Sequence, residues 1–343
     1  MCIRDRKQVR RHRNKSKKFR KMKGGESLNR QLFSACYYGN VELVMDLVDR
    51  GADVNARNEF EWTPLHKACI YGHMEVAMAL VDRGADIDAR DEEQRTPLHQ
   101  ACYYGHMELV LALVDRGADI HARDGGQKTP LHKACVYDNM EVAMALVDRG
   151  ADIHARDENE MTPLHQALLS GNMEVAMALV NRGANIHARD EQQRTPLHWA
   201  CHSGIMEVVI DLLDRGADID ARDVDQWTPL HNACWRGRIE VAMALVDRGA
   251  DVNAINNRGD TPLDYLLMEN RNRLESMINR NVGNVMNSMI GRTETRSAVD
   301  ELSEDPFSRL NRLPREIIKY GINPNLGGKR KTKKRKTRRR KTR

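Results

Sequence analysis

The order of apolar and polar residues along the chain predicts short pairs of helices separated by polar loops. In residues 63–95, Leu65, Ala68 and Cys69 form one apolar stripe at helical spacing, and the segment 74–82 carries a second stripe. Threonine followed by proline favours a helix start, because the hydroxyl caps an early amide and proline lacks the amide that would stay unpaired. Segments this short cannot bury their own stripes, so the pattern requires neighbouring copies to pack on them.

The same pattern returns with a constant period of 33 residues. Thr-Pro-Leu-Asp begins at Thr261, and a degenerate copy without Thr-Pro begins near Ser27. Between them lie six copies of Thr-Pro-Leu-His, which begin at Thr63, Thr96, Thr129, Thr162, Thr195 and Thr228. A fixed period of this length predicts an all-α solenoid of about eight helix-turn-helix units.

Thr-Pro-Leu-His, followed in almost every copy by Asp-Arg-Gly-Ala-Asp, resembles the ankyrin-repeat family. The resemblance implies a solenoid over residues 27–280, with hairpin fingers between the helix pairs. Its parts would be an N-terminal cap repeat (27–59), six full repeats (60–257) and a C-terminal cap repeat (258–280) with a charged second helix, Arg271–Arg280. The resemblance also implies that a protein partner binds in a concave groove lined by finger tips and inner helices.

The fingers depart from the family pattern at one position. The family usually has glycine two residues before the threonine, whereas six copies here have a glutamate or glutamine: Glu61, Gln94, Gln127, Glu160, Gln193 and Gln226. We therefore expect finger turns that are less regular than in the family. Asp138 also replaces the glycine between two helices, which is tolerable because aspartate visits the left-handed region more readily than most residues.

Catalytic, metal and cofactor sites are not expected. Six of the seven cysteines share one repeat position: Cys36, Cys69, Cys102, Cys135, Cys201 and Cys234. Stacked helices lie about 8–10 Å apart, beyond the roughly 7 Å reach of a disulfide, so we interpret these cysteines as small core residues. Histidine and cysteine three residues apart could begin a zinc site, but Leu168 interrupts the pattern, and the resemblance assigns the histidine to hydrogen bonds within the turn. A phosphate loop, a nucleophile elbow and a zinc-protease motif are all missing, so we predict no enzyme.

Aromatic residues at variable repeat positions are the candidates for partner binding, because aromatic side chains are typical anchors of interfaces. The predicted anchors are Trp62, Tyr71, Tyr103, Tyr104, Tyr137, Trp199, Trp227 and Trp235. The alternative is that some of them pack between adjacent repeats. A second stripe, on the outer helices, is interpreted as half-buried filler between repeats or, alternatively, as a second contact surface: Met45, Met78, Leu111, Met144, Met177, Ile210 and Met243.

Charge divides the chain into an acidic body and two basic tails. Residues 1–25 carry a net charge of +11 and residues 327–343 carry +12, which leaves −17 for residues 26–326 out of a total of +6. We expect tails 1–26 and 327–343 to be disordered and to contact nucleic acid nonspecifically or an import receptor. No run approaches the roughly 18 apolar residues of a membrane span. An intracellular monomer in cytoplasm or nucleus is expected, and arrays with such ends resemble those of large DNA viruses.

The linker 281–326 contains a short amphipathic segment, 306–320. Within it, Leu313, Pro314, Glu316 and Ile317 resemble the opening of an F-box, of which the chain has room for only the first third. Related degenerate boxes end poxviral ankyrin proteins and recruit a ubiquitin ligase. The segment is therefore interpreted either as a plain capping helix or as the ligase-docking element of a substrate adaptor.

Overall fold

The computed structural model describes residues 27–137, 139–266 and 279 of the chain. Over this part the chain folds into pairs of helices. These residues hold fourteen α-helices and one 3-10 helix and contain no strand. They divide into two compact units at the boundary between Asn185 and Ile186. The all-α prediction is therefore confirmed.

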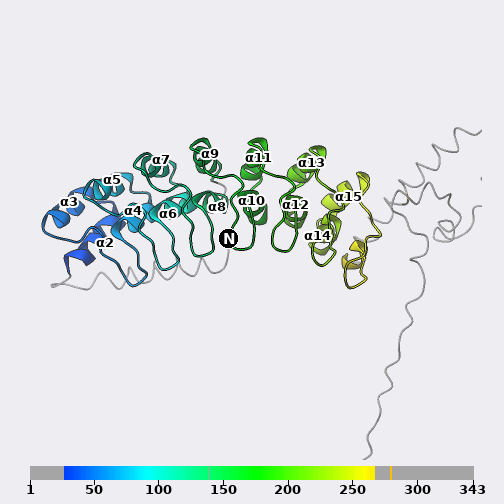
Figure 1. The fold of residues 1–343 in the computed structure, drawn as a ribbon, viewed down its shortest axis with the longest axis horizontal. Coiled ribbons are helices and arrows are strands. Elements are labelled where there is room, and N and C mark those ends of the chain that lie inside the picture. Colours follow the sequence, from blue (N-terminus) through cyan, green and yellow to red (C-terminus); the bar gives the residue numbers. More distant parts are fainter. Residues whose placement is uncertain (1–26, 138, 267–278, 280–343) are drawn as a thin grey trace, which may run out of the picture. The chain divides into compact units, whose positions relative to one another are not determined.

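Each repeat contributes a first helix and a second helix (Figure 1). The first helices are α2 (Leu28–Tyr38), α4 (Pro64–Tyr71), α6 (Pro97–Tyr104), α8 (Pro130–Ala134) and α10 (Pro163–Ser170) in the first unit, and α12 (Pro196–Ser203) and α14 (Pro229–Trp235) in the second. The second helices are α3 (Val41–Asp49), α5 (Met74–Asp82), α7 (Met107–Asp115), α9 (Met140–Asp148) and α11 (Met173–Asn181), followed by α13 (Met206–Asp214) and α15 (Ile239–Asp247). The 3-10 helix η1 (Pro262–Tyr265) begins the last repeat.

A reciprocal cap starts each first helix of the Thr-Pro-Leu-His type. In α4 the amide of His66 donates to the Thr63 hydroxyl (3.3 Å), and the Thr63 amide donates to Nδ1 of His66 (3.2 Å). Histidine thus fills the place that glutamate or glutamine takes in the usual capping box. Nε2 of His66 then donates to the carbonyl of Arg95 in the following finger (2.9 Å). The expectation that this histidine ties the turn together is confirmed.

The turn from first to second helix needs a left-handed residue and fits closely against the next repeat. Gly72 has φ of 72°, and its amide donates to the carbonyl of Ala68. A Cβ at this position would lie 2.5 Å from the His106 ring, whose Nε2 donates to the carbonyl of Ile70 (3.3 Å). Glycine is therefore required here both for its backbone angle and for the space it leaves.

The finger turns are regular, contrary to the sequence-based expectation. All six glutamate or glutamine residues before the threonines have positive φ, between 57° and 61°. An aspartate or asparagine five residues before each threonine stabilises the turn: Oδ1 of Asp91, for example, accepts from the amides of Glu93 (3.0 Å) and Arg95 (2.8 Å). The Arg90 guanidinium also donates to the carbonyl of Gln94 (3.2 Å). These bonds hold the left-handed residue in place without glycine.

Within each unit, first helices pack on first helices and second helices on second helices. In the first unit α2, α4, α6, α8 and α10 contact one another in order, as do α3, α5, α7, α9 and α11 (Figure 1). In the second unit α12 contacts α14, and α13 contacts α15. The six repeated cysteines are buried and unbridged, as predicted. The methionine-rich stripe is half-buried throughout, which agrees with its interpretation as filler between repeats.

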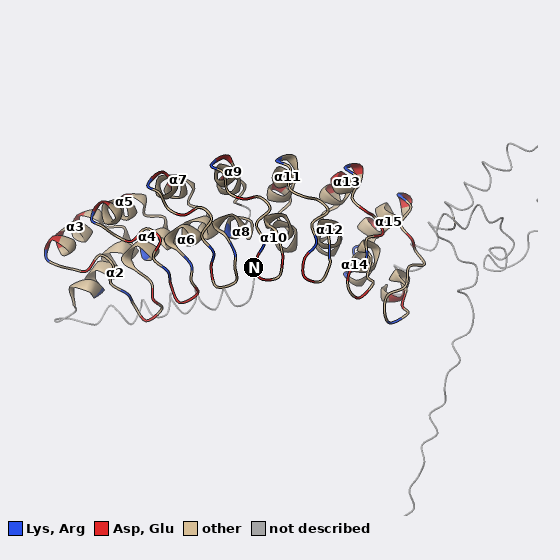
Figure 2. Ribbon diagram, in the orientation of Figure 1, with Lys and Arg blue, Asp and Glu red and all other residues tan. Residues whose placement is uncertain are grey.

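Charged residues gather in the fingers and at the ends of the second helices (Figure 2). An arginine of one finger donates to the carbonyl one repeat on, as Arg57 does to Arg90 (2.8 Å) and Arg222 to Ile255 (3.1 Å). The second helices carry a parallel series of exposed ion pairs between consecutive repeats, for example Arg83 with Asp49. Surface pairs of this kind contribute little singly. The carbonyl contacts fix the stacking register of the fingers.

Several predictions lie outside the described residues. These concern Asp138, the charged helix Arg271–Arg280, both basic tails, the linker 281–326 and its F-box-like residues. Next to Asp138, the first helix α8 ends early, at Ala134, where its counterparts α4 and α6 run through the tyrosines before their glycines. Among the helices that are described, none combines the length and the apolar character that crossing a bilayer requires.

Candidate protein-binding face

Aromatic side chains gather at the carboxyl ends of the first helices in the first unit. The rings of Tyr37 and Tyr71, from neighbouring repeats, lie 4.6 Å apart, and Tyr37 and Tyr38 lie 4.7 Å apart, both edge to face. Tyr38 is 71% exposed. Burial, with smaller effects from Tyr37 and Tyr104, raises the pKa of Tyr71 to about 12, so its hydroxyl stays protonated.

A second group of tyrosines continues this face. Tyr103 and Tyr137 lie 4.7 Å apart edge to face, and their hydroxyls share a hydrogen bond of 2.7 Å. Tyr104 packs against Tyr103 at 5.1 Å and is 41% exposed. Tyr71 and Tyr104 are thus the last residues of α4 and α6, Tyr103 lies directly before Tyr104, and Tyr137 lies in the turn after α8.

Trp62 and Trp199 are placed differently, since both are buried, at 7% and 8% exposure. The indole N–H of Trp62 donates to Oδ2 of Asp91 (3.1 Å), and that of Trp199 donates to Oδ2 of Asp190 (3.0 Å). A side chain buried this deeply presents little surface to a partner. These two tryptophans follow the alternative in which aromatic residues pack inside the array.

In the second unit, Trp227 and Trp235 form the corresponding cluster. Their rings lie 5.8 Å apart and perpendicular, and the ring of His202 lies 5.7 Å from Trp235. Trp227 is half-buried, whereas Trp235 is 51% exposed beneath the Arg236 guanidinium, 5.3 Å from its ring. Burial lowers the pKa of His202 to about 4, and nearby arginines add to the effect. The cluster is therefore an exposed aromatic surface beside permanent positive charge.

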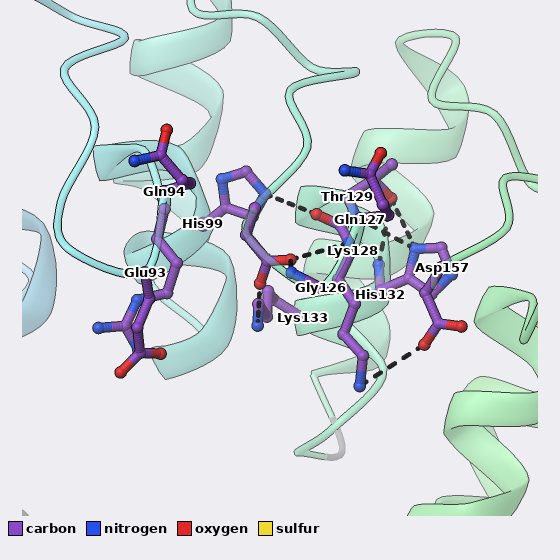
Figure 3. A network of polar contacts seen from close by, with 12 residues as sticks. Glu93, Gln94, His99, Gly126, Gln127, Lys128, Thr129, His132, Lys133 and Asp157 are labelled. Atoms are coloured by element: carbon purple, nitrogen blue, oxygen red, sulfur yellow. Dashed lines mark hydrogen bonds and ion pairs between the residues drawn. The ribbon is translucent and has the colours of Figure 1, made fainter. Parts of the chain in front are cut away.

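A set of buried acids in the fingers was missed by reasoning from sequence. They stand five residues before the threonines, and the buried ones are Asp91, Asp124, Asp157 and Asp190. Among these acids Asp124 pairs with Lys133 (2.6 Å). Asp157 lies 3.7 Å from Lys128, and Figure 3 shows these two side chains facing each other. The signal was present in the sequence: aspartate or asparagine occupies this position in every copy from Asn58 to Asn256.

The titratable groups of the described repeats show no activated nucleophile or metal site. Burial raises the pKa of the Cys36 and Cys234 thiols to about 12, and it raises those of the other repeated cysteines as well. A thiol must lose its proton to act as nucleophile or ligand, so these cysteines are poorly suited to either task. No group of three or more histidine, cysteine or acidic residues in the described part is arranged to hold a metal ion.

Repeated helix pairs with partly exposed aromatic side chains define a helical repeat protein. Models of ankyrin repeats match residues 32–124 and 131–223, each as three copies, and residues 212–266 as part of a many-copy array. The chain therefore belongs to the ankyrin-repeat family, whose repeats are general protein–protein interaction modules. No curated protein matches the chain.

Proposed function

We propose that this chain is a non-enzymatic scaffold that binds a protein partner through the carboxyl ends of its first helices and the adjoining fingers. The supporting observation is that aromatic side chains from consecutive repeats meet there and remain partly exposed, up to 71% for Tyr38. Aromatic residues at the centre of an interface contribute most of its binding free energy. The family supports the mode of binding, and the identity of the partner depends on the individual side chains.

Two of these residues, Tyr104 and Trp235, form the best test because they are exposed, at 41% and 51%. Once a partner has been isolated with the full chain, Tyr104→Ala and Trp235→Ala are each expected to weaken binding by about 2 kcal/mol, roughly thirtyfold. Isothermal titration calorimetry measures the affinity, and circular dichroism verifies that each variant is folded.

Met74→Ala is the matched control. Met74 is 41% exposed, the same as Tyr104, but it starts the second helix α5 rather than ending a first helix. Its replacement should leave the affinity unchanged. If Met74→Ala weakens binding while Tyr104→Ala and Trp235→Ala do not, the binding face lies on the second helices and the proposal is wrong.

A further inference from the structure

Three of the four buried finger acids are matched by a donor nine residues later in the chain. Gln100 Nε2 donates to Asp91 Oδ2 (3.3 Å), Lys133 Nζ to Asp124 Oδ2 (2.6 Å) and Trp199 Nε1 to Asp190 Oδ2 (3.0 Å). The donor differs chemically from repeat to repeat, but its place on the first helix is constant. This pairing satisfies a carboxylate that burial would otherwise make costly.

The first copy of this pair, Asn58 and Lys67, has the donor without the acid. Asn58 stands at the finger position, where its Oδ1 accepts from the amides of Phe60 (2.9 Å) and Trp62 (3.0 Å). Nine residues later comes Lys67, the counterpart of Lys133. Among the described residues no carboxylate forms an ion pair with Lys67, because the side chain of Asn58 carries no charge.

Aromatic rings surround the Lys67 ammonium instead. Nζ lies 5.2 Å from the ring centre of Tyr71, 5.3 Å from that of Trp62 and 5.5 Å from that of Tyr37. Lys67 is half-buried, and this burial lowers its pKa to about 8, so most of the population remains charged at neutral pH. Rings attract a cation but do not neutralise it. The site therefore combines a positive charge that no carboxylate of the described residues pairs with and the apolar surface of a typical interface anchor.

We propose that the site formed by Tyr37, Tyr38, Trp62, Lys67 and Tyr71 binds an acidic side chain of the protein partner, an aspartate or glutamate next to an apolar residue. The carboxylate supplies the counter-charge that Asp124 supplies to Lys133, and the apolar neighbour packs on the tyrosines. Tyr38, 71% exposed, offers the accessible edge of this site. The inference rests on the proposed function and specifies the chemistry of the partner at one position.

A displayed library of random peptides, selected on the full chain, tests this specificity without knowledge of the natural partner. The wild-type chain is expected to enrich peptides with aspartate or glutamate beside an apolar residue. Resynthesis of enriched peptides with asparagine or glutamine at the acidic position should weaken binding about tenfold or more, as expected for loss of a charge-assisted hydrogen bond. Binding is measured by fluorescence anisotropy.

Two variants of the chain remove the site in different ways. Lys67→Gln deletes the charge, and Asn58→Asp supplies an internal carboxylate, so both should lose the preference for acidic peptides. Lys133→Gln, at the same helix position but already paired in the wild type, should keep it. Because Asn58→Asp restores the pairing found in other repeats, it is expected to fold even if Lys67→Gln does not.

The outcomes separate the two proposals. Enriched peptides without an acidic preference, or acidic peptides that bind Lys67→Gln and Asn58→Asp as tightly as wild type, overturn the assignment of Lys67 and leave the scaffold function intact. If the wild-type chain enriches no peptide at all, the proposed function fails as well, since the aromatic face then does not recognise a protein segment.

Discussion

Lowering the pH from 7 to 5 should destabilise the repeats through their capping histidines. Burial lowers the pKa of His99, His132 and His198 to about 4, and it also lowers those of His66 and His231. The geometry explains why the neutral ring is required. At His132 the Thr129 amide donates to Nδ1 (3.2 Å), so a proton on Nδ1 would face another donor.

The size of the effect follows from the difference in proton binding between the two states. Unfolded histidines take up a proton near pH 6.5, whereas the folded ones do so only near pH 4, so stability is complete above about pH 6.5 and declines as the pH falls toward 4. From pH 7 to pH 5 each such site loses about 2 kcal/mol. The three sites together lose about 5–6 kcal/mol, a large part of the stability of an ordinary domain.

Urea unfolding of the full chain at pH 7, 6 and 5, followed by circular dichroism at constant ionic strength, measures this loss. His132→Gln isolates one site, because glutamine can also complete a capping box but does not titrate. Its free energy of unfolding should depend on pH by about 2 kcal/mol less than that of the wild type. His121→Gln, which changes an exposed histidine, should behave as wild type. Equal pH dependence in His132→Gln and wild type would refute the reasoning.

Two further predictions concern the backbone. Gly72→Ala should destabilise the chain more than Gly84→Ala. Both positions have positive φ, 72° and 86°, and this backbone angle costs alanine about 1–2 kcal/mol. Only at Gly72 does the new methyl group also meet a side chain, 2.5 Å from His106. Equal thermal denaturation midpoints would show that the contact with His106 is unimportant. Gln127→Gly should raise stability by up to about 1 kcal/mol in urea unfolding, since φ of 59° strains glutamine, whereas Gln127→Ala should give no gain. A loss on Gln127→Gly would mean that the turn does not strain its glutamine.

The parts of the fold that depend on local contacts could be predicted from sequence. Thr63, Pro64 and His66 act on one another within a single turn, and the period of 33 residues then requires stacking. The regular finger turns could not be predicted in this way. Their left-handed residue is held by Asp91 and by an arginine of the same finger, so its backbone angle depends on several side chains acting together. A missing glycine alone was therefore a poor guide to irregularity.

The binding face was harder to predict because the burial of an aromatic residue depends on what stands in the next repeat. Trp62 is buried because its indole meets Asp91, a residue 29 positions later. Trp235 varies in the same way along the sequence but has no such acid over it, and its ring stays exposed beside Arg236. Both vary along the sequence and were therefore candidates, and the contact with a buried acid distinguishes the buried Trp62 from the exposed Trp235.

The pairing of a finger acid with the residue nine positions later explains how the repeats can share one fold and still differ in their side chains. The threonine and histidine caps recur almost unchanged, so every repeat folds and stacks by the same contacts. The position nine residues after the finger acid is free to change, since glutamine, lysine and tryptophan all satisfy the acid from it. A substitution there changes the partner of the acid without altering the caps. Where the acid itself is lost, as at Asn58, the Thr63–His66 cap is still formed, and Lys67 is the donor for which we propose an acidic side chain of the partner.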